Sequence, residues 1–260
     1  MGYTKIISYG NTLEVYEYEK DVFLLVGRSR RDIEDTDDDE SCGINRKNTL
    51  QKRDSEASLG KRSDNARRAS MAFRRIVASN LGGPSRPLLV TITYADNFTD
   101  LKQAYRHFSA FIQSLRYRFG KDFKYISVPE FQKRGAVHFH ALIWGLPKEL
   151  FLLERETRTL AKIWGKGFVY LKETDGDEKL AFYLSKYMAK AFVDPRLKNQ
   201  KCYVASRNMK RPIVEGGNFS ASLMIEQFGI VDEVVVDRKY QTKWLGEGRY
   251  RLLKIQDDKS

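Results

Sequence analysis

The order of apolar patterns in the middle of the chain limits its possible folds more than any other feature. Residues 88–94 form a β-branched run typical of buried strands, and residues 100–118 repeat apolar side chains at helical spacing. Two more strand-like runs follow at 123–128 and 136–144, joined by a short segment that contains Gly135. A strand, a long helix and a candidate hairpin in this order predict a compact α+β unit.

Weaker patterns surround this unit. Downstream we expect a helix over 149–163, a strand over 167–172 and a helix over 179–192, which the pair Asp194-Pro195 ends. The remaining predicted elements are strands at 5–9, 13–18, 22–26, 234–236 and 250–255, and a basic helix at 66–77. We therefore divide the chain into an N-terminal segment (1–80), a core (81–215) and a β-like tail (216–260).

Charge narrows the class of partner. The chain of 260 residues has 46 Lys and Arg against 34 Asp and Glu, a formal net charge of +12. Such an excess favours a polyanion such as nucleic acid, although a merely basic protein has the same composition. On the helix at 66–77, Arg67, Arg68, Arg74 and Arg75 either lie along DNA phosphates or form a solvated face of a packed helix. An acidic run at 32–40 predicts a solvated loop.

Other compositional features exclude several classes. The two cysteines, Cys42 and Cys202, form neither a disulfide framework nor a thiolate zinc site. The first residues lack the pattern of a signal peptide, and no apolar stretch is long enough to span a membrane. No Gly-rich phosphate loop ending in Gly-Lys-Ser/Thr occurs, so we expect chemistry without ATP. We expect a cytoplasmic protein with no membrane partner.

Two of the three histidines lie in one predicted strand. His138 and His140 are two positions apart, so their side chains point to the same face, with Phe139 on the other. Glu130 ends the preceding strand, and a hairpin would bring it close to both imidazoles. Two imidazoles and a carboxylate can hold Mn²⁺ or Mg²⁺ with coordination positions left open. A polar sheet face without metal remains the alternative.

A second cluster lies on the predicted helix at 179–192. Tyr183 and Tyr187 are four positions apart on one helical face, and Lys186 and Lys190 repeat that spacing one position further round. A phenol beside ammonium groups can attack phosphorus and form a phosphotyrosine. Tyrosines at helical spacing are also common in packing, and lysines are commonly solvated.

The two clusters in this order resemble the His-hydrophobic-His (HUH) endonuclease superfamily, specifically the rolling-circle replication initiators (Rep proteins) of plasmids and single-stranded DNA phages. Three motifs carry the resemblance: a Thr-hydrophobic-Thr strand at Thr91-Ile92-Thr93, the His pair with Glu130 upstream, and Tyr-x-x-Lys, present twice as Tyr183/Lys186 and Tyr187/Lys190. The wider strings at 129–138 and 206–212 are similar to plasmid-type initiators. The His pair precedes the tyrosines, whereas conjugative relaxases have the reverse order.

The resemblance implies a central antiparallel sheet of about five strands, with a ferredoxin- or RRM-like topology and helices packed on it. The strand at 88–94 should lie beside that at 137–144, and the tyrosine helix should face the His pair. His138, His140 and Glu130 would hold Mn²⁺ or Mg²⁺. Tyr187, our first choice, or Tyr183 would attack the scissile phosphate, with Lys186 or Lys190 neutralising charge.

The same resemblance implies partners and a role. Single-stranded origin DNA would be nicked and rejoined through a 5′-phosphotyrosine, and the free 3′-OH would prime a host polymerase. A separate host helicase would unwind the duplex, since the chain has no helicase motif. Lys133 and Arg134, in the loop between the two strands, are expected to contact DNA. Tyr105, Tyr117 and Phe131 are candidates for stacking on unpaired bases, although core packing is equally compatible and is favoured for Tyr105.

Three alternatives stay open at this point. A non-catalytic protein would bind an origin through the basic helix and need no tyrosine nucleophile. A metal-dependent hydrolase would use water and leave no protein–DNA adduct. A single-strand DNA transposase of the HUH type would join the cut end to a target site.

Overall fold

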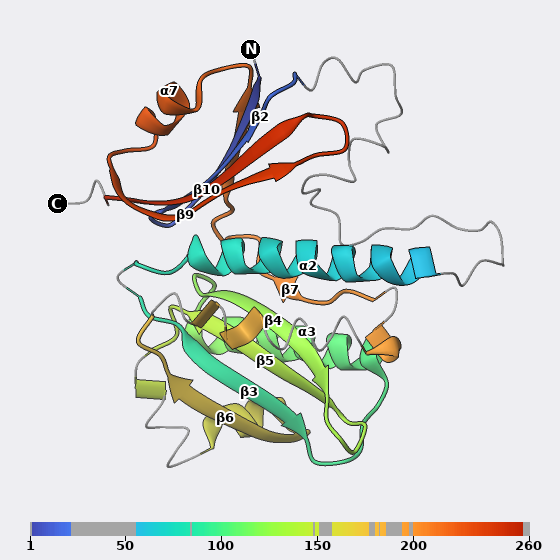
Figure 1. Cartoon of the computed structure of the whole chain (residues 1–260). Coiled ribbons are helices and arrows are strands. Elements are labelled where there is room, and N and C mark those ends of the chain that lie inside the picture. The colour runs from blue at the N-terminus through green and yellow to red at the C-terminus, as the bar shows by residue number, and fades with distance from the viewer. Residues whose placement is uncertain are drawn as a thin grey trace. The chain divides into compact units, whose positions relative to one another are not determined.

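The structure is a computed structural model that describes residues 2–21, 56–83, 85–147, 149–150, 158–176, 180–181, 183–185, 194–197 and 200–256. The chain divides into two compact units (Figure 1). One comprises Met1–Glu40 together with Lys210–Ser260, and we call it the terminal unit. The other comprises Ser41–Met209, and we call it the inserted unit. Each is built on a five-stranded antiparallel sheet, which confirms the predicted α+β class.

The inserted unit has the strand–helix order that the middle of the sequence predicts. Its elements are α2 (Glu56–Ala78), β3 (Leu88–Tyr94), α3 (Leu101–Phe119), β4 (Lys124–Phe131), β5 (Val137–Trp144), α5 (Thr159–Trp164), β6 (Gly167–Glu173), the 3-10 helix η2 (Pro195–Leu197) and β7 (Val204–Ala205). The strand order is β6-β3-β5-β4-β7. The run β3-α3-β4-β5-α5-β6 is the β-α-β-β-α-β arrangement of ferredoxin-like folds. Strand β3 pairs with β5, as expected.

Helix α3 forms where the sequence places it because its apolar residues recur on one side. The Asp100 side chain caps its first turn by accepting from the backbone N–H of Gln103, at 3.0 Å. Helix α3 ends at Gly120, whose φ of +91° favours glycine. Its buried residues are Leu101, Ala104, Phe108, Phe111, Ile112 and Leu115.

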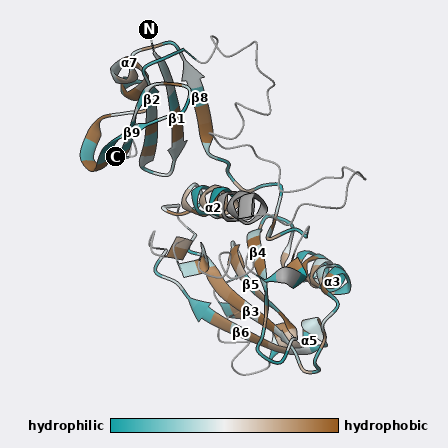
Figure 2. Cartoon of the chain, turned by 45° about the vertical axis from the view of Figure 1, so that its right-hand side comes forward, coloured by the Kyte–Doolittle hydropathy of each residue, from teal (hydrophilic) through white to brown (hydrophobic). Residues whose placement is uncertain are grey.

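The two faces of this sheet differ in what covers them. The ring of Phe139 on β5 stacks on Phe108 of α3 with centroids 4.9 Å apart, and Phe111 of α3 meets Trp164 of α5 at 5.8 Å. Helices α3 and α5 therefore lie on the face that carries Phe139. Hydrophobic residues run along β3, β4 and β5 (Figure 2). The neighbours of Phe139 in the chain, His138 and His140, point to the opposite face.

The terminal unit combines the two ends of the chain in one sheet. Its elements are β1 (Tyr3–Tyr9), β2 (Thr12–Tyr18), β8 (Ile213–Gly217), α7 (Ala221–Glu226), β9 (Val231–Gln241) and β10 (Glu247–Ile255), with the strand order β8-β1-β2-β10-β9. Strands β1 and β2 form a hairpin whose two loop residues are Gly10, at φ +56°, and Asn11. The core of the terminal unit consists of Ile6, Leu13, Val15, Ala221, Met224, Ile225 and Leu253.

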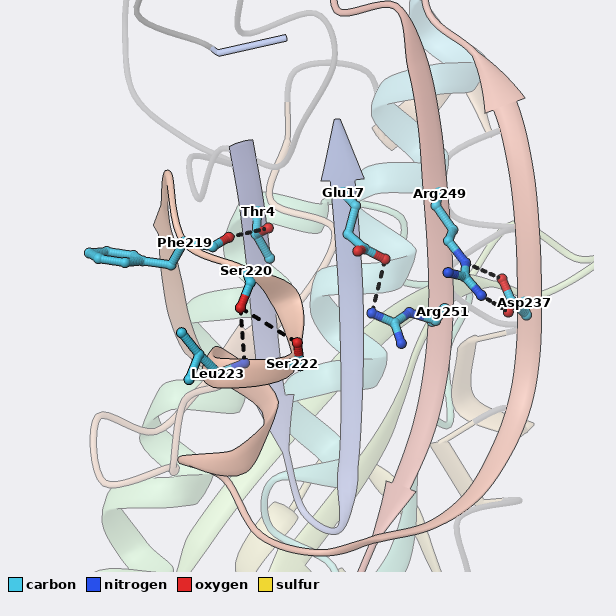
Figure 3. A network of polar contacts seen from close by, with 9 residues as sticks. All are labelled: Thr4, Glu17, Phe219, Ser220, Ser222, Leu223, Asp237, Arg249 and Arg251. Carbon is cyan, nitrogen blue, oxygen red and sulfur yellow. Dashed lines mark hydrogen bonds and ion pairs between the residues drawn. The ribbon is translucent and has the colours of Figure 1, made fainter. Parts of the chain in front are cut away.

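Polar contacts supplement this core (Figure 3). Arg251 on β10 pairs with Glu17 on β2 at 2.9 Å, and Arg249 donates to both carboxylate oxygens of Asp237 at 2.9 and 2.6 Å. The Arg249–Asp237 pair is exposed, and such pairs contribute about 0–1 kcal/mol each, whereas the Arg251–Glu17 pair is partly buried. The Ser220 hydroxyl caps α7.

The division of the chain differs from the one that the sequence suggests. We expected segments 1–80 and 216–260 to be separate, yet β1 and β2 pair with β8 and β10. The basic helix belongs to the inserted unit, as part of the longer α2. Strand β8 and helix α7 were not predicted. The predicted strand at 22–26 and the acidic run at 32–40 lie outside the described residues.

Candidate functional site

The β4–β5 hairpin positions the acidic residue and both histidines as the sequence predicts. Glu130 lies directly opposite His138, and Val128 lies opposite His140. Residues directly opposite each other in an antiparallel pair share a face, so Glu130 and both imidazoles occupy one face. The turn residue Gly135 adopts a φ of +95°, a conformation that glycine adopts without strain. The hairpin thus brings together three side chains that are potential metal ligands.

His140 contacts both of the other side chains. The rings of His138 and His140 stack with centroids 4.8 Å apart. His140 Nε2 lies 2.9 Å from Glu130 Oε2, and the Glu130 side chain is 20% exposed. Because a carboxylate accepts only, Nε2 of His140 carries the proton in this contact. The cluster is a half-buried patch of two nitrogen ligands and one oxygen ligand.

His138 is held from both sides by hydrogen bonds. The Arg134 Nε donates to Gln132 Oε1 at 3.0 Å, so the amide nitrogen of Gln132 faces His138 Nδ1, at 3.1 Å. Nδ1 therefore accepts, and Nε2 donates to the Thr93 hydroxyl at 2.9 Å. Burial, with the neighbouring charge of His140, lowers the pKa of His138 to about 4. The ring is therefore neutral at pH 7, as a metal ligand must be.

Strand β3 explains why a Thr-x-Thr pattern belongs to this site. Thr93 lies opposite His138, and Thr91 lies opposite His140. Both hydroxyls reach the imidazoles, with Thr91 Oγ1 at 3.5 Å from His140 Nδ1. The sequence identified this pattern only by resemblance. Its positioning role follows from the strand register, which the sequence does not state.

Among the described residues, no group of three or more His, Cys, Asp and Glu side chains is arranged to hold a metal ion. His140 and Glu130 bond to each other, and both ring nitrogens of His138 are engaged by Thr93 and Gln132. Binding one cation with all three side chains requires replacing the His140–Glu130 hydrogen bond and freeing a nitrogen of His138. The donor set fits Mn²⁺ or Mg²⁺ in kind.

Only part of the tyrosine cluster is described. Tyr183 lies in a helical stretch and is 42% exposed, whereas its neighbour Leu184 is buried. Tyr187, Lys186 and Lys190 lie outside the described residues. That a tyrosine faces the His pair therefore stays a prediction.

The expected DNA contacts occupy different environments. Arg67 is exposed, Arg68 and Arg74 are half-buried, and Arg75 is only 3% exposed, so it is not part of an exposed basic face. Lys133 is exposed at the hairpin loop. The guanidinium of Arg134 also donates to the Ala95 and Tyr94 carbonyls, at 3.0 and 2.5 Å. It supports Gln132 and the end of β3.

The aromatic candidates are also separated. Tyr105 and Phe131 pack partly against the core, and the Arg196 guanidinium lies 3.9 Å from the Phe131 ring. Tyr117 is 96% exposed on α3, which covers the face opposite the His pair. Phe168 and Tyr170 on β6 were not among the predicted candidates, although their alternation with Val169 and Leu171 in the sequence indicates that they share one face.

Comparison with known proteins gives one partial match, which covers the segment that contains this site. Residues 87–192 match the family model described as Replication-associated protein ORF2/G2P, which is less than half of the chain. The match includes Glu130, both histidines and the Tyr/Lys cluster. It supports a replication-associated protein of the initiator type that acts on DNA. Neither a curated protein nor a solved structure matches the chain. In the described part of the chain, no helix is long and apolar enough to cross a membrane.

Proposed function

We propose that this protein is a rolling-circle replication initiator that nicks and rejoins single-stranded origin DNA through a covalent phosphotyrosine. One observation carries the proposal: His138 and His140 lie side by side on β5, and Glu130 lies across the hairpin, 2.9 Å from His140. The position of this cluster inside a segment similar to replication-associated proteins supports it. Host helicase and polymerase are the partners that this role requires.

The three side chains would hold a divalent cation. A Mn²⁺ or Mg²⁺ bound there would supply Lewis-acid polarisation of a phosphate oxygen. Thr91 and Thr93, from the neighbouring strand, fix the orientation of the imidazoles. Outer hydrogen bonds of this kind commonly change metal affinity 10- to 100-fold, so they are part of the site.

The proposed chemistry is a transesterification, in which the new phosphotyrosine bond conserves the energy of the broken phosphodiester bond. The phenol oxygen of Tyr187 or Tyr183 attacks phosphorus, and its O–P bond replaces the P–O3′ bond. The phenol proton passes to the departing 3′ oxygen, which becomes a free 3′-OH. Lys186 and Lys190 neutralise the charge of the pentavalent transition state. A 3′-OH reverses the step later and rejoins the strand.

Capture of the covalent product tests the proposal. A pool of random single-stranded oligonucleotides, labelled at the 3′ end, is incubated with protein and Mn²⁺ and separated on a denaturing gel. The 3′ label is needed because the protein stays on the 5′ phosphate of the downstream fragment. Sequencing the captured DNA then identifies the origin. The variants Tyr183→Phe, Tyr187→Phe and His140→Ala run alongside, with Tyr117→Phe and His107→Ala as matched controls.

We expect an SDS-resistant adduct that requires metal and His140, disappears in a Tyr183→Phe or Tyr187→Phe variant, and persists in both controls. Cleavage without an adduct would show a hydrolase that uses water. Tight DNA binding without cleavage or adduct would show a non-catalytic origin-binding protein. Transfer of the label to a second DNA, without circle release, would identify a transposase. Each of these three results contradicts the proposal.

A further inference from the structure

Strand β6 presents two aromatic rings and a cation on one face. Phe168 and Tyr170 are 62% and 65% exposed, and Lys172 is exposed two positions further along. Val169 and Leu171, between them, point to the opposite face and join the core. Strand β6 lies at the edge of this sheet, and β3 is the one strand that pairs with it among the described residues. We call Phe168, Tyr170 and Lys172 the β6 platform.

The register places the β6 platform on the same face as the His pair. Phe168 lies opposite Thr93, which lies opposite His138, and Tyr170 lies opposite Thr91, which lies opposite His140. Each ring is thus in one cross-strand row with one imidazole. Neighbouring strands are about 4.8 Å apart, so ring and imidazole backbones are separated by about 10 Å. A strand of nucleic acid held at the His pair can therefore reach the platform.

Exposure of both rings calls for an explanation. Single exposed apolar residues are ordinary, but Phe168 and Tyr170 place two exposed rings two positions apart on one face of an edge strand. Two positions along a strand span about 7 Å, so each ring is accessible to a separate planar group. The Lys172 ammonium adds a positive charge beside them. Stacking rings next to a cation suit an unpaired base and its phosphate.

We propose that the β6 platform stacks unpaired bases of the DNA strand whose phosphate lies at the His pair, and so selects single-stranded over duplex DNA. The inference rests on the proposed function for its choice of DNA as the partner. A base in a duplex is stacked on its neighbours and cannot lie on either ring. Phe168 and Tyr170 hold the bases, and Lys172 contacts the backbone.

Binding without cleavage tests the platform separately from the chemistry. The affinity for a fluorescein-labelled single strand of about 20 nucleotides is measured by anisotropy in EDTA, at one fixed salt concentration. The same measurement uses its duplex form. The variants are Phe168→Leu, Tyr170→Leu and the double variant, which keep apolar bulk without a ring. Tyr170→Phe keeps the ring, and Tyr117→Leu removes an exposed ring from α3 on the other layer. Circular dichroism and thermal unfolding verify that each variant folds.

We expect each lost ring to weaken single-strand binding by about 5- to 150-fold, whereas Tyr170→Phe and Tyr117→Leu bind like the wild type. Duplex binding should be unchanged. Unchanged single-strand affinity in the double variant would overturn the inference, as would equal weakening for single strand and duplex.

The two proposals fail in different assays. If the Phe168→Leu/Tyr170→Leu double variant forms covalent adducts and binds single-stranded DNA with normal affinity, the role of the platform is contradicted and the proposed function is not. If the double variant loses affinity for single-stranded DNA alone, and the wild type forms no adduct, the role of the platform is supported and the proposed nicking chemistry is contradicted.

Discussion

Replacing Glu130 with Gln separates a structural role of this side chain from a role in binding metal. Glu130 Oε2 accepts a hydrogen bond from His140 Nε2 at 2.9 Å. The amide oxygen of Gln accepts the same bond at nearly the same position, but it carries no charge for a cation. The metal-free fold should therefore tolerate the change, whereas the stabilisation by metal should be lost.

The expected size follows from this contact. A hydrogen bond to a charged group contributes about 1.5–3 kcal/mol and a neutral one about 1 kcal/mol, so metal-free stability should fall by about 1 kcal/mol. A cation at 100 times its Kd stabilises by about 2.7 kcal/mol. If the variant binds about 100-fold more weakly, about 0.4 kcal/mol remains. For a unit of this size the metal-induced rise in Tm should drop from about 5–11 °C to about 1–2 °C.

Thermal unfolding in EDTA and in excess MnCl₂ measures both quantities, and titration calorimetry gives the Kd directly. Glu173→Gln is the matched control, since it makes the same chemical change on an exposed residue of β6. A full metal-induced rise in Glu130→Gln would refute the assignment of Glu130 as a ligand. A loss of several kcal/mol in EDTA would show instead that the carboxylate is mainly structural.

Three further predictions concern the frame around the site. Phe139→Ala should lower the free energy of unfolding by about 3–5 kcal/mol and Phe139→Leu by less than about 1.5 kcal/mol, because the ring is fully buried; equal urea midpoints for the two variants would contradict this packing. His138 has its pKa lowered to about 4 from 6.5, so the unfolded chain binds the proton more tightly. The contribution of neutral His138 to the free energy of unfolding should therefore be fully present above pH 6.5 and decrease towards pH 4. Urea titrations in EDTA should show that His138→Gln lacks this decrease; the same pH dependence of the unfolding free energy in wild type and variant would contradict the prediction. In Gly167→Ala, at φ +149°, the new Cβ would lie 2.4 Å from the Thr93 carbonyl oxygen. We expect the free energy of unfolding to fall by at least about 2 kcal/mol and the backbone amides of β6 to exchange hydrogen faster. Amide protection in β6 equal to that of the wild type would contradict the predicted clash.

The strands that hold the site were predictable because their local patterns are strong. The β-branched run at Leu88–Tyr94 has the predicted bounds, and the alternation around Phe139 fixed which face His138 and His140 share. Glu130 followed from the shortness of the hairpin. Signals of this kind depend only on near neighbours in the chain, and so they can be read from sequence.

Features that depend on distant pairing were not predictable. Nothing local to residues 12–18 indicates that β10 will pair with them, so the terminal unit was divided into separate segments. The supporting role of Arg134 follows from the end of β3, whose carbonyls it contacts, and not from its place in a basic loop. Arg75 has the same residue type and helix as Arg67, yet it is buried. Burial follows from packing and not from composition.

The pairing of the β1–β2 hairpin with β8 and β10 has a consequence for synthesis of the chain. About 195 residues separate the end of β2 from the start of β8, and at roughly 5–20 residues per second the ribosome needs about 10–40 s to make them. During that time neither of the strands that pair with the hairpin in the described residues, β8 and β10, has been made, whereas β3 to β7 of the inserted unit are synthesised. Isolated hairpins are marginally stable. The order of assembly is therefore set by the chain: the sheet with the histidines can form first, and the β1–β2 hairpin can pair with β8 and β10 only later.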